Sequence, residues 1–152
     1  MQPSVPGERP EAGHEVRLFV YGLLLQGERE HALLEGAPLL GEAFTAPEHT
    51  LVDLDFYPAL LVGGRAAVSG ELYGVSRHLR FKLDVHHQCP ALFRRVSIKL
   101  ADGTEAETYA MDEEKVRGKR RLRGGSWRGR FEPRKSSLPP GPMTQYAKKR
   151  FS

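Results

Sequence analysis

The sequence has few of the residues that mark several common classes of protein. It contains one cysteine, Cys89, in 152 residues, so it offers neither an intramolecular disulfide nor a cluster of thiolates for a metal. No apolar run approaches the roughly 20 residues needed to cross a bilayer. Residues 1–13 are rich in Pro, Gly and Glu and lack the apolar segment of a secretory signal peptide. We therefore expect a cytoplasmic protein without a membrane span.

The distribution of Pro, Gly and apolar residues divides the chain into three parts. Residues 1–15 show no apolar periodicity and are predicted to form a disordered leader. Residues 16–131 carry most of the apolar side chains, and we expect them to form one domain with its own core. Residues 132–152 include Leu138-Pro139-Pro140-Gly141-Pro142 and are predicted to be a basic tail with polyproline character.

Charge is distributed unevenly along the chain. Residues 1–111 contain 10 Lys and Arg against 15 Asp and Glu, whereas residues 112–152 contain 13 against 4. A basic C-terminal part of this kind attracts polyanions or acidic protein surfaces, and the attraction weakens as salt rises. The alternative is that these charges only keep a C-terminal extension solvated and bind no partner. The few aromatic residues there do not make a platform for nucleic-acid bases, so nucleic-acid binding is at most an accessory role.

Short β-prone segments separated by turn residues make up most of the predicted domain. Strands are expected at 16–21, 41–46, 49–54 and 66–75, and helices at 28–35 and 77–84. The clearest pattern is a hairpin, in which residues 92–100 alternate with period two, Asp102-Gly103 forms the turn, and 105–111 return as the partner strand. Tyr57-Pro58 and Gly63-Gly64 are read as turns. Strands without βαβ alternation indicate an α+β domain with a curled, mainly antiparallel sheet.

A series of short motifs, in order and near the expected spacing, resembles the γ-glutamylcyclotransferase-like family. That family runs V-Y-G-(S/T)-L-x-x-G and then N-H-x-x-L, and this chain has Val20 to Gly27 followed by Glu30-His31-Ala32-Leu33-Leu34. The later motifs are Tyr57-Pro58-Ala59-Leu60, Val68 to Tyr73, Leu83-Asp84, Phe93-Arg94-Arg95, Ala106 to Tyr109 and, as in the γ-glutamylamine branch, Gly124-Gly125-Ser126-Trp127. The resemblance implies a small mixed, mainly antiparallel β-barrel flanked by short helices.

The resemblance also implies a binding loop after the first strand. In the family, backbone N–H groups of this loop bind the carboxylate of a γ-glutamyl substrate, and the matching residues here are Tyr21, Gly22, Leu23 and Leu24. Leu23 replaces the usual Ser or Thr, which removes a hydroxyl group but keeps the amides. The alternative is that Tyr21-Gly22 only ends the strand and binds no ligand. Tyr109 is the tyrosine that we expect nearest to a ligand.

The main departure from the family is His87. The family's substrate closes on itself: its α-amine attacks its γ-carbonyl and releases an amine or peptide and 5-oxoproline. The glutamate that ends L-D-x-x-E accepts the proton of the α-ammonium, and His87 stands at its position in Leu83-Asp84-Val85-His86-His87. A neutral imidazole can accept a proton but does not supply the negative charge. No Glu lies between Glu71 and Glu105 to replace it through a shifted alignment.

Other polar residues are predicted to be structural. Asp84 is expected to cap or support its helix, Glu71 to make hydrogen bonds in the barrel wall, and His31 to pack against the loop. Tyr57 and Tyr73 are candidates for the cavity wall or the core. No metal is expected at His86-His87, because adjacent side chains diverge on a strand and no further ligands follow at suitable spacing. No cofactor is expected.

Two functions follow from these residues. The first is a protein with a degenerate active site, which binds a γ-glutamyl small molecule or a protein partner without turnover. The second is an active cyclotransferase in which His87 is a substitute base. The basic tail would add a protein or polyanion partner under either hypothesis.

Overall fold

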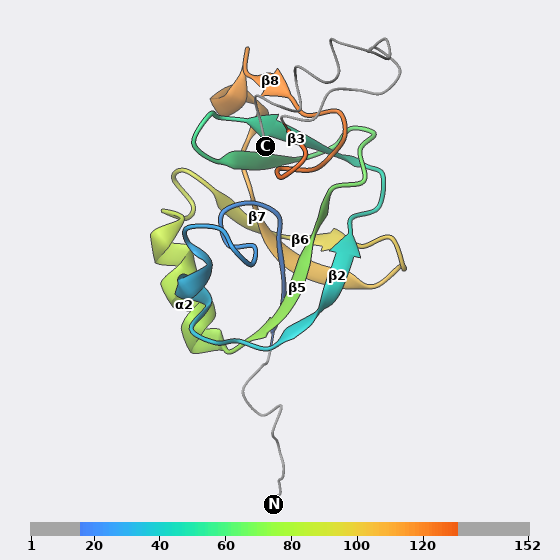
Figure 1. Cartoon of the computed structure of the whole chain (residues 1–152). Helices are drawn as coiled ribbons and strands as arrows, with labels where there is room; N and C mark the ends of the chain where they lie inside the picture. The colour runs from blue at the N-terminus through green and yellow to red at the C-terminus, as the bar shows by residue number, and fades with distance from the viewer. Residues whose placement is uncertain (1–15, 131–152) are drawn as a thin grey trace, which may run out of the picture.

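One curled sheet of eight strands forms the centre of the molecule (Figure 1). A computed structural model describes residues 16–130. The strands are β1 (Val16–Val20), β2 (Leu39–Phe44), β3 (His49–Asp53), β4 (Pro58–Val62), β5 (Ser69–Val75), β6 (Arg94–Lys99), β7 (Glu105–Ala110) and β8 (Arg120–Arg121). They are ordered β2-β5-β1-β7-β4-β3-β8, and β6 pairs with β7. The predicted leader (1–15) and tail (132–152) lie outside the described residues.

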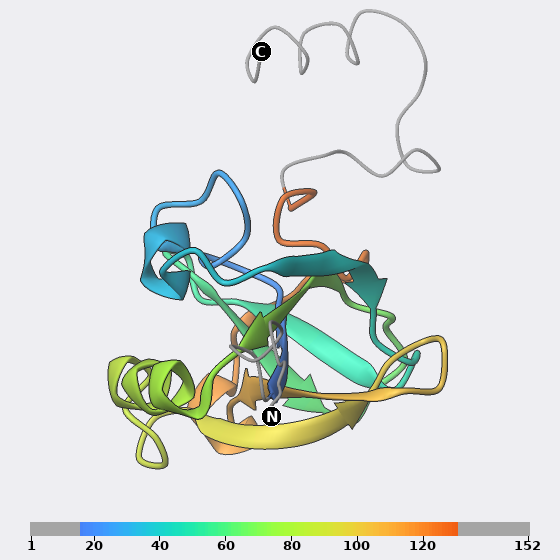
Figure 2. The same ribbon diagram turned by 90° about the horizontal axis from the view of Figure 1, so that it is seen from below.

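The sheet is mixed and mainly antiparallel, as predicted. β7 pairs in parallel with both β1 and β4, and the remaining pairs are antiparallel. Seen from below, the strands curve around a common interior (Figure 2). The fold is therefore an α+β domain with a barrel-like sheet, and the predicted hairpin is its β6–β7 pair with six paired positions.

The one α-helix in the described part of the chain is α2 (Arg77–His86). Ser76 begins the helix, because its hydroxyl oxygen accepts a hydrogen bond from the N–H of Leu79 at 3.0 Å. Leu79 and Leu83 face the core, and the N–H of His87 donates to the carbonyl of Leu83 at the other end. The helix extends two residues beyond the predicted end, so His87 is a helix cap rather than a strand residue.

Two sequence predictions were wrong. The predicted helix at 28–35 is only a 3₁₀ turn, η2 (His31–Leu34), because residues 22–30 are folded by successive turn hydrogen bonds. β4 was read as a turn at Tyr57-Pro58. Pro58 is in fact the first residue of a strand, a position that proline tolerates, and residues 58–61 are all buried.

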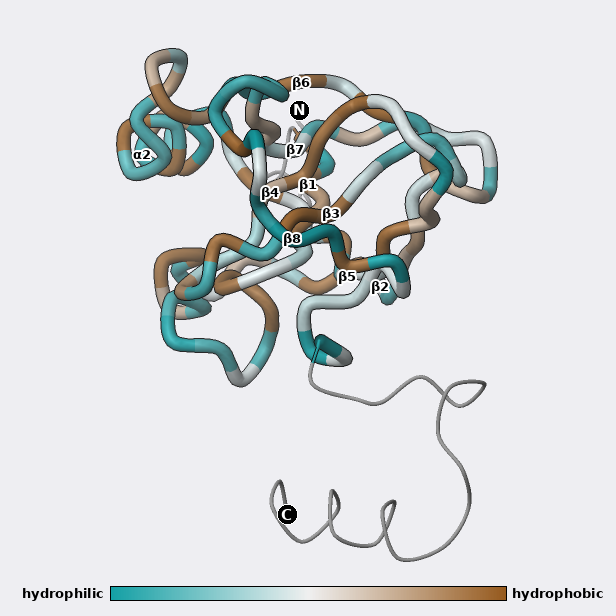
Figure 3. The backbone as a smooth tube through the Cα atoms, turned by 90° about the horizontal axis from the view of Figure 1, so that it is seen from above, coloured by the Kyte–Doolittle hydropathy of each residue, from teal (hydrophilic) through white to brown (hydrophobic). Residues whose placement is uncertain are grey.

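The core consists of two clusters of buried side chains, one on each side of β1 and β7. Hydrophobic segments concentrate on the central strands, whereas the tube alternates between hydrophobic and hydrophilic along α2 (Figure 3). The segment that follows β7 contributes Val116, from the 3₁₀ helix η3 (Glu113–Val116), and Trp127, both of which are buried. The basic segment up to residue 130 is thus part of the domain. None of the helices found in residues 16–130 is long and apolar enough to cross a membrane.

Candidate functional site

A cavity of about 230 Å³ lies where the loop after β1 meets the end of α2. In Figure 1 these two segments lie beside each other at one side of the sheet. The cavity is lined by Phe19, Val20, Tyr21, Gly22, Leu23, Leu24, Glu30, Tyr57, Pro58, His86, His87, Gln88, Leu92, Phe93, Thr108 and Tyr109. All six residues predicted for the site are in this set, although three separate segments of the chain supply them.

The loop after β1 is shaped by a close approach to β4. A Cβ atom on Gly22 would lie 2.5 Å from Cγ of Pro58, so only glycine fits at this position without a shift of the wall. The N–H of Leu25 donates to the carbonyl of Gly22 and closes a turn at 3.1 Å. Within residues 16–130, no acceptor is bonded to the N–H groups of Leu23 and Leu24. The loop therefore has two backbone donors available at the cavity wall, as an anion-binding loop requires.

Tyr21 joins this loop to the sheet beneath it. Its buried hydroxyl donates to the carbonyl of Tyr109 at 2.6 Å and accepts from the N–H of Leu60 at 3.1 Å. Burial raises the pKa of Tyr21 far above its usual value, so the group is a neutral hydroxyl. Its role is to fix β1, β4 and β7 relative to one another.

His87 lies across the cavity from the loop and is held on two sides. Its Nδ1 is 2.8 Å from the carbonyl of Leu83, a contact that requires a proton on Nδ1 and leaves the lone pair on Nε2. The imidazole stacks on the ring of Tyr109, with centroids 3.9 Å apart and planes 5° apart. The pKa of His87 is lowered to about 4, chiefly by burial. The hydrogen bond to the Leu83 carbonyl opposes this shift, the nearby His86 adds to it, and Glu30 and Asp84 oppose it more weakly. At neutral pH His87 is thus an uncharged, weakly basic ring.

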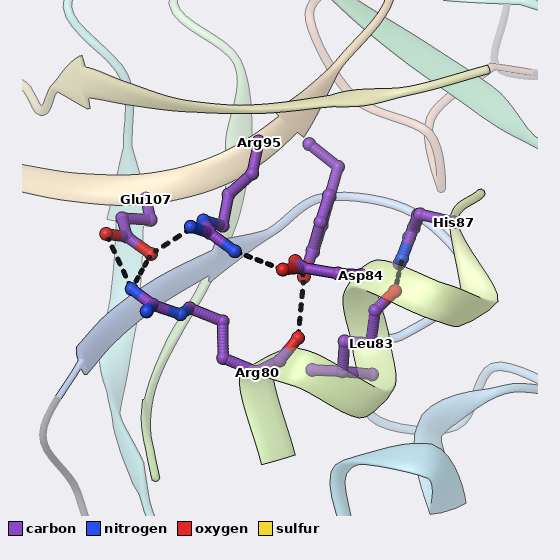
Figure 4. A network of polar contacts seen from close by, with 7 residues as sticks. Arg80, Leu83, Asp84, His87, Arg95 and Glu107 are labelled. Carbon is purple, nitrogen blue, oxygen red and sulfur yellow. Dashed lines mark hydrogen bonds and ion pairs between the residues drawn. The ribbon is translucent and has the colours of Figure 1, made fainter. Parts of the chain in front are cut away.

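A polar network behind Tyr109 fixes the other side of the stack. The hydroxyl of Tyr109 donates to Oδ1 of Asp84 at 2.6 Å, and the second oxygen of Asp84 pairs with Arg95. Figure 4 shows that Arg95 also approaches Glu107, which accepts from Arg80 through both oxygens at 3.1 Å. Burial and the carboxylate of Asp84 raise the pKa of Tyr109 well above its usual value. Asp84 therefore has a structural role, as predicted, but its carboxylate binds Tyr109 and Arg95 instead of capping its helix.

Glu30 is the cavity residue that the sequence reasoning missed. It precedes η2, and its N–H donates to the carbonyl of Leu23 at 3.0 Å, so it is tied directly to the loop. Its Oε1 lies 3.0 Å from Nε2 of His86, in the last turn of α2. The signal for Glu30 was present, because it occupies the asparagine position of the N-H-x-x-L motif.

Among the remaining candidates, one tyrosine belongs to the cavity wall and the others have structural partners. Tyr57 lines the cavity, whereas the hydroxyl of Tyr73 donates to Glu71 at 3.0 Å. Glu71 also accepts from the N–H of Gln26, and His31 contacts the carbonyl of Leu24 through Nδ1 at 2.8 Å. Both behave as predicted.

The expectation that the side chains of His86 and His87 diverge was wrong. α2 continues through His86, and the two rings meet edge to face at 5.2 Å. Among residues 16–130, no group of three or more His, Cys, Asp or Glu residues is arranged to hold a metal ion.

Most of the described chain is similar to proteins of one known family. Residues 18–129 match the profile of the family described as "Gamma-glutamyl cyclotransferase, AIG2-like". A "Putative gamma-glutamylcyclotransferase" of Vibrio cholerae is 42% identical over 87 residues, which are 57% of this chain and 75% of that protein. Human γ-glutamylaminecyclotransferase is 35% identical over 97 residues, covering 55% of this chain and 60% of its own length. The crystal structure of a protein specific to uropathogenic E. coli superimposes with a TM-score of 0.67 at 25% identity, covering 74% of this chain and 92% of the other.

Proposed function

Because the chain belongs to the γ-glutamyl cyclotransferase, AIG2-like family, we propose that its cavity binds the α-amino acid head of a γ-glutamyl compound with little or no turnover. The loop amides of Leu23 and Leu24 would receive the α-carboxylate. The γ-amide would lie toward the apolar wall formed by Tyr57, Leu92 and Phe93. The protein would then be a binding or regulatory module that retains the cavity of its relatives.

The observation that carries this proposal is the state of His87. Cyclisation requires removal of a proton from an α-ammonium, and a positioned base contributes about 10²- to 10⁴-fold to such a step. An imidazole with a pKa of about 4 is a poor acceptor for that proton. It is also uncharged, so it does not attract the ammonium. Its flat stack on Tyr109 makes it a wall of the cavity.

One feature favours an active enzyme as the second candidate. Because Nδ1 is bonded to the carbonyl of Leu83, the Nε2 lone pair of His87 is directed away from the helix end, and no bond to it is formed within residues 16–130. Such a nitrogen accepts a proton in principle. In that case the rate would fall only when His87 becomes protonated, near pH 4 rather than near 6.5.

The test is release of 5-oxoproline from γ-glutamyl amines, γ-glutamyl dipeptides and glutathione by the unmodified protein and by His87→Glu. His78→Glu, on the exposed face of α2, is the matched control. Product only from His87→Glu, together with ligand binding by the unmodified protein, is the expected result. Turnover by the unmodified protein at rates comparable with His87→Glu would overturn the proposal in favour of the active enzyme. Absence of both turnover and binding would exclude γ-glutamyl compounds as ligands.

A further inference from the structure

Glu30 is the one acidic residue among those that line the cavity, and no Lys or Arg lines it. The other titratable side chains of the wall are two histidines and three tyrosines. The hydroxyls of Tyr21 and Tyr109 are engaged elsewhere, and the hydroxyl of Tyr57 carries no charge. A cavity with one carboxylate and no fixed cation favours a ligand group of positive charge.

Glu30 is also held in a defined position. Its backbone is bonded to Leu23, one of the two residues whose N–H groups face no acceptor in the described chain. Its carboxylate spans from this loop to α2, where Oε1 contacts His86. Within residues 16–130 no hydrogen bond is made to Oε2, so one oxygen is available to a ligand.

These contacts put a negative group and a pair of backbone donors on the same loop. An α-amino acid carries a carboxylate and an ammonium on one carbon, and it therefore needs an anion-binding and a cation-binding group close together. The loop supplies the first through Leu23 and Leu24 and the second through Glu30. Charge-assisted hydrogen bonds of this kind are about twice as strong as neutral ones.

We propose that Glu30, positioned by His86, binds the α-ammonium group of the ligand and replaces the negative charge that His87 does not provide. The inference rests on the proposed function, because it concerns the same cavity and the same ligand head. Under this proposal, the carboxylate that binds the ligand lies on the loop after β1 and not at position 87 at the end of α2. When His86 is neutral, its Nε2–H donates to Oε1 and leaves the charge of Glu30 in place.

The experiment compares two probes that differ by the ammonium group alone. One is L-γ-glutamyl-methylamide, and the other is N-methylglutaramic acid, which has the same carboxylate and amide but no amine. Binding of each is measured by calorimetry at pH 7.5 to the unmodified protein, to Glu30→Gln and to Glu28→Gln. Glu28 lies on the same loop, pairs with Arg128 and does not line the cavity, so it is the matched control.

We expect Glu30→Gln to weaken binding of L-γ-glutamyl-methylamide by about 10- to 100-fold, the range of a lost charged hydrogen bond. Binding of N-methylglutaramic acid should stay within about twofold, which also shows that the variant keeps its cavity. Glu28→Gln should leave both affinities unchanged. His86→Gln should weaken the first probe less than Glu30→Gln does.

Two results would separate the proposals. Equal affinity of Glu30→Gln and the unmodified protein for L-γ-glutamyl-methylamide would overturn the role of Glu30 and leave the proposed function standing. Failure of both probes to bind the unmodified protein would overturn both.

Discussion

The imidazole of His87 lies flat against the phenol of Tyr109, with ring centroids 3.9 Å apart. This stack joins the end of α2 to the last paired positions of β7 and closes one side of the cavity. A carboxylate at position 87 would lose the ring contact, so this side of the cavity is an aromatic wall.

The partly buried, uncharged state of His87 predicts a loss of stability in acid. Its folded pKa is about 4, below the value of about 6.5 in an unfolded chain, so between these values the unfolded state binds more protons. Stability is therefore fully present above about pH 6.5 and declines as the pH falls toward 4. The decline attributable to this group is of the order of 3 kcal/mol. Urea unfolding at pH 7 and pH 4.5 should show a smaller difference for His87→Gln than for the unmodified protein. Equal pH dependence in the two proteins would contradict a partly buried ring that stays neutral.

Removal of the Tyr21 hydroxyl should lower the free energy of unfolding measurably. Tyr21→Phe leaves the N–H of Leu60 and the carbonyl of Tyr109 without their partner in a buried region, which costs about 1–3 kcal/mol. The free energy of unfolding, measured with urea, should fall by this amount. Tyr57→Phe is the control, because the hydroxyl of Tyr57 makes no hydrogen bond within the described residues and should be almost neutral. A similar loss in both variants would assign the effect to the aromatic rings.

The hairpin and the site differed in how far the sequence predicted them. Alternation at 92–100 and the Asp102-Gly103 turn gave the correct β6–β7 pair, because a half-exposed antiparallel pair has a period that sequence shows directly. β4 is buried along residues 58–61, so its sequence shows no alternation of apolar and polar residues. Without that pattern, Pro58 indicated a turn instead of a strand. The length of α2 was underestimated, since its last turn is stabilised by the carbonyl of Leu83 and by packing rather than by local propensity.

The site itself was predicted from motifs, and the missing part was a contact distant in sequence. Tyr21 to Leu24, His87 and Tyr109 do meet at one cavity. Glu30 and His86 are 56 positions apart and are brought together only when the loop packs beside α2. Periodicity and spacing carry no information on such a contact.

The close approach of Gly22 and Pro58 gives the last prediction. Gly22→Ala places a Cβ atom 2.5 Å from Cγ and 2.7 Å from Cδ of Pro58, and the proline ring has no flexible end that can move aside. The loop must shift away from β4, and overpacking of this kind costs about 1–3 kcal/mol. Because the same shift displaces the N–H groups of Leu23 and Leu24, ligand affinity should fall together with stability. Thermal unfolding and calorimetry with L-γ-glutamyl-methylamide measure the two effects. Gly124→Ala is the control, since an added Cβ there meets no atom within 4 Å, and it should change neither quantity. If Gly22→Ala bound the ligand as well as the unmodified protein does, the loop amides would not form the anion site.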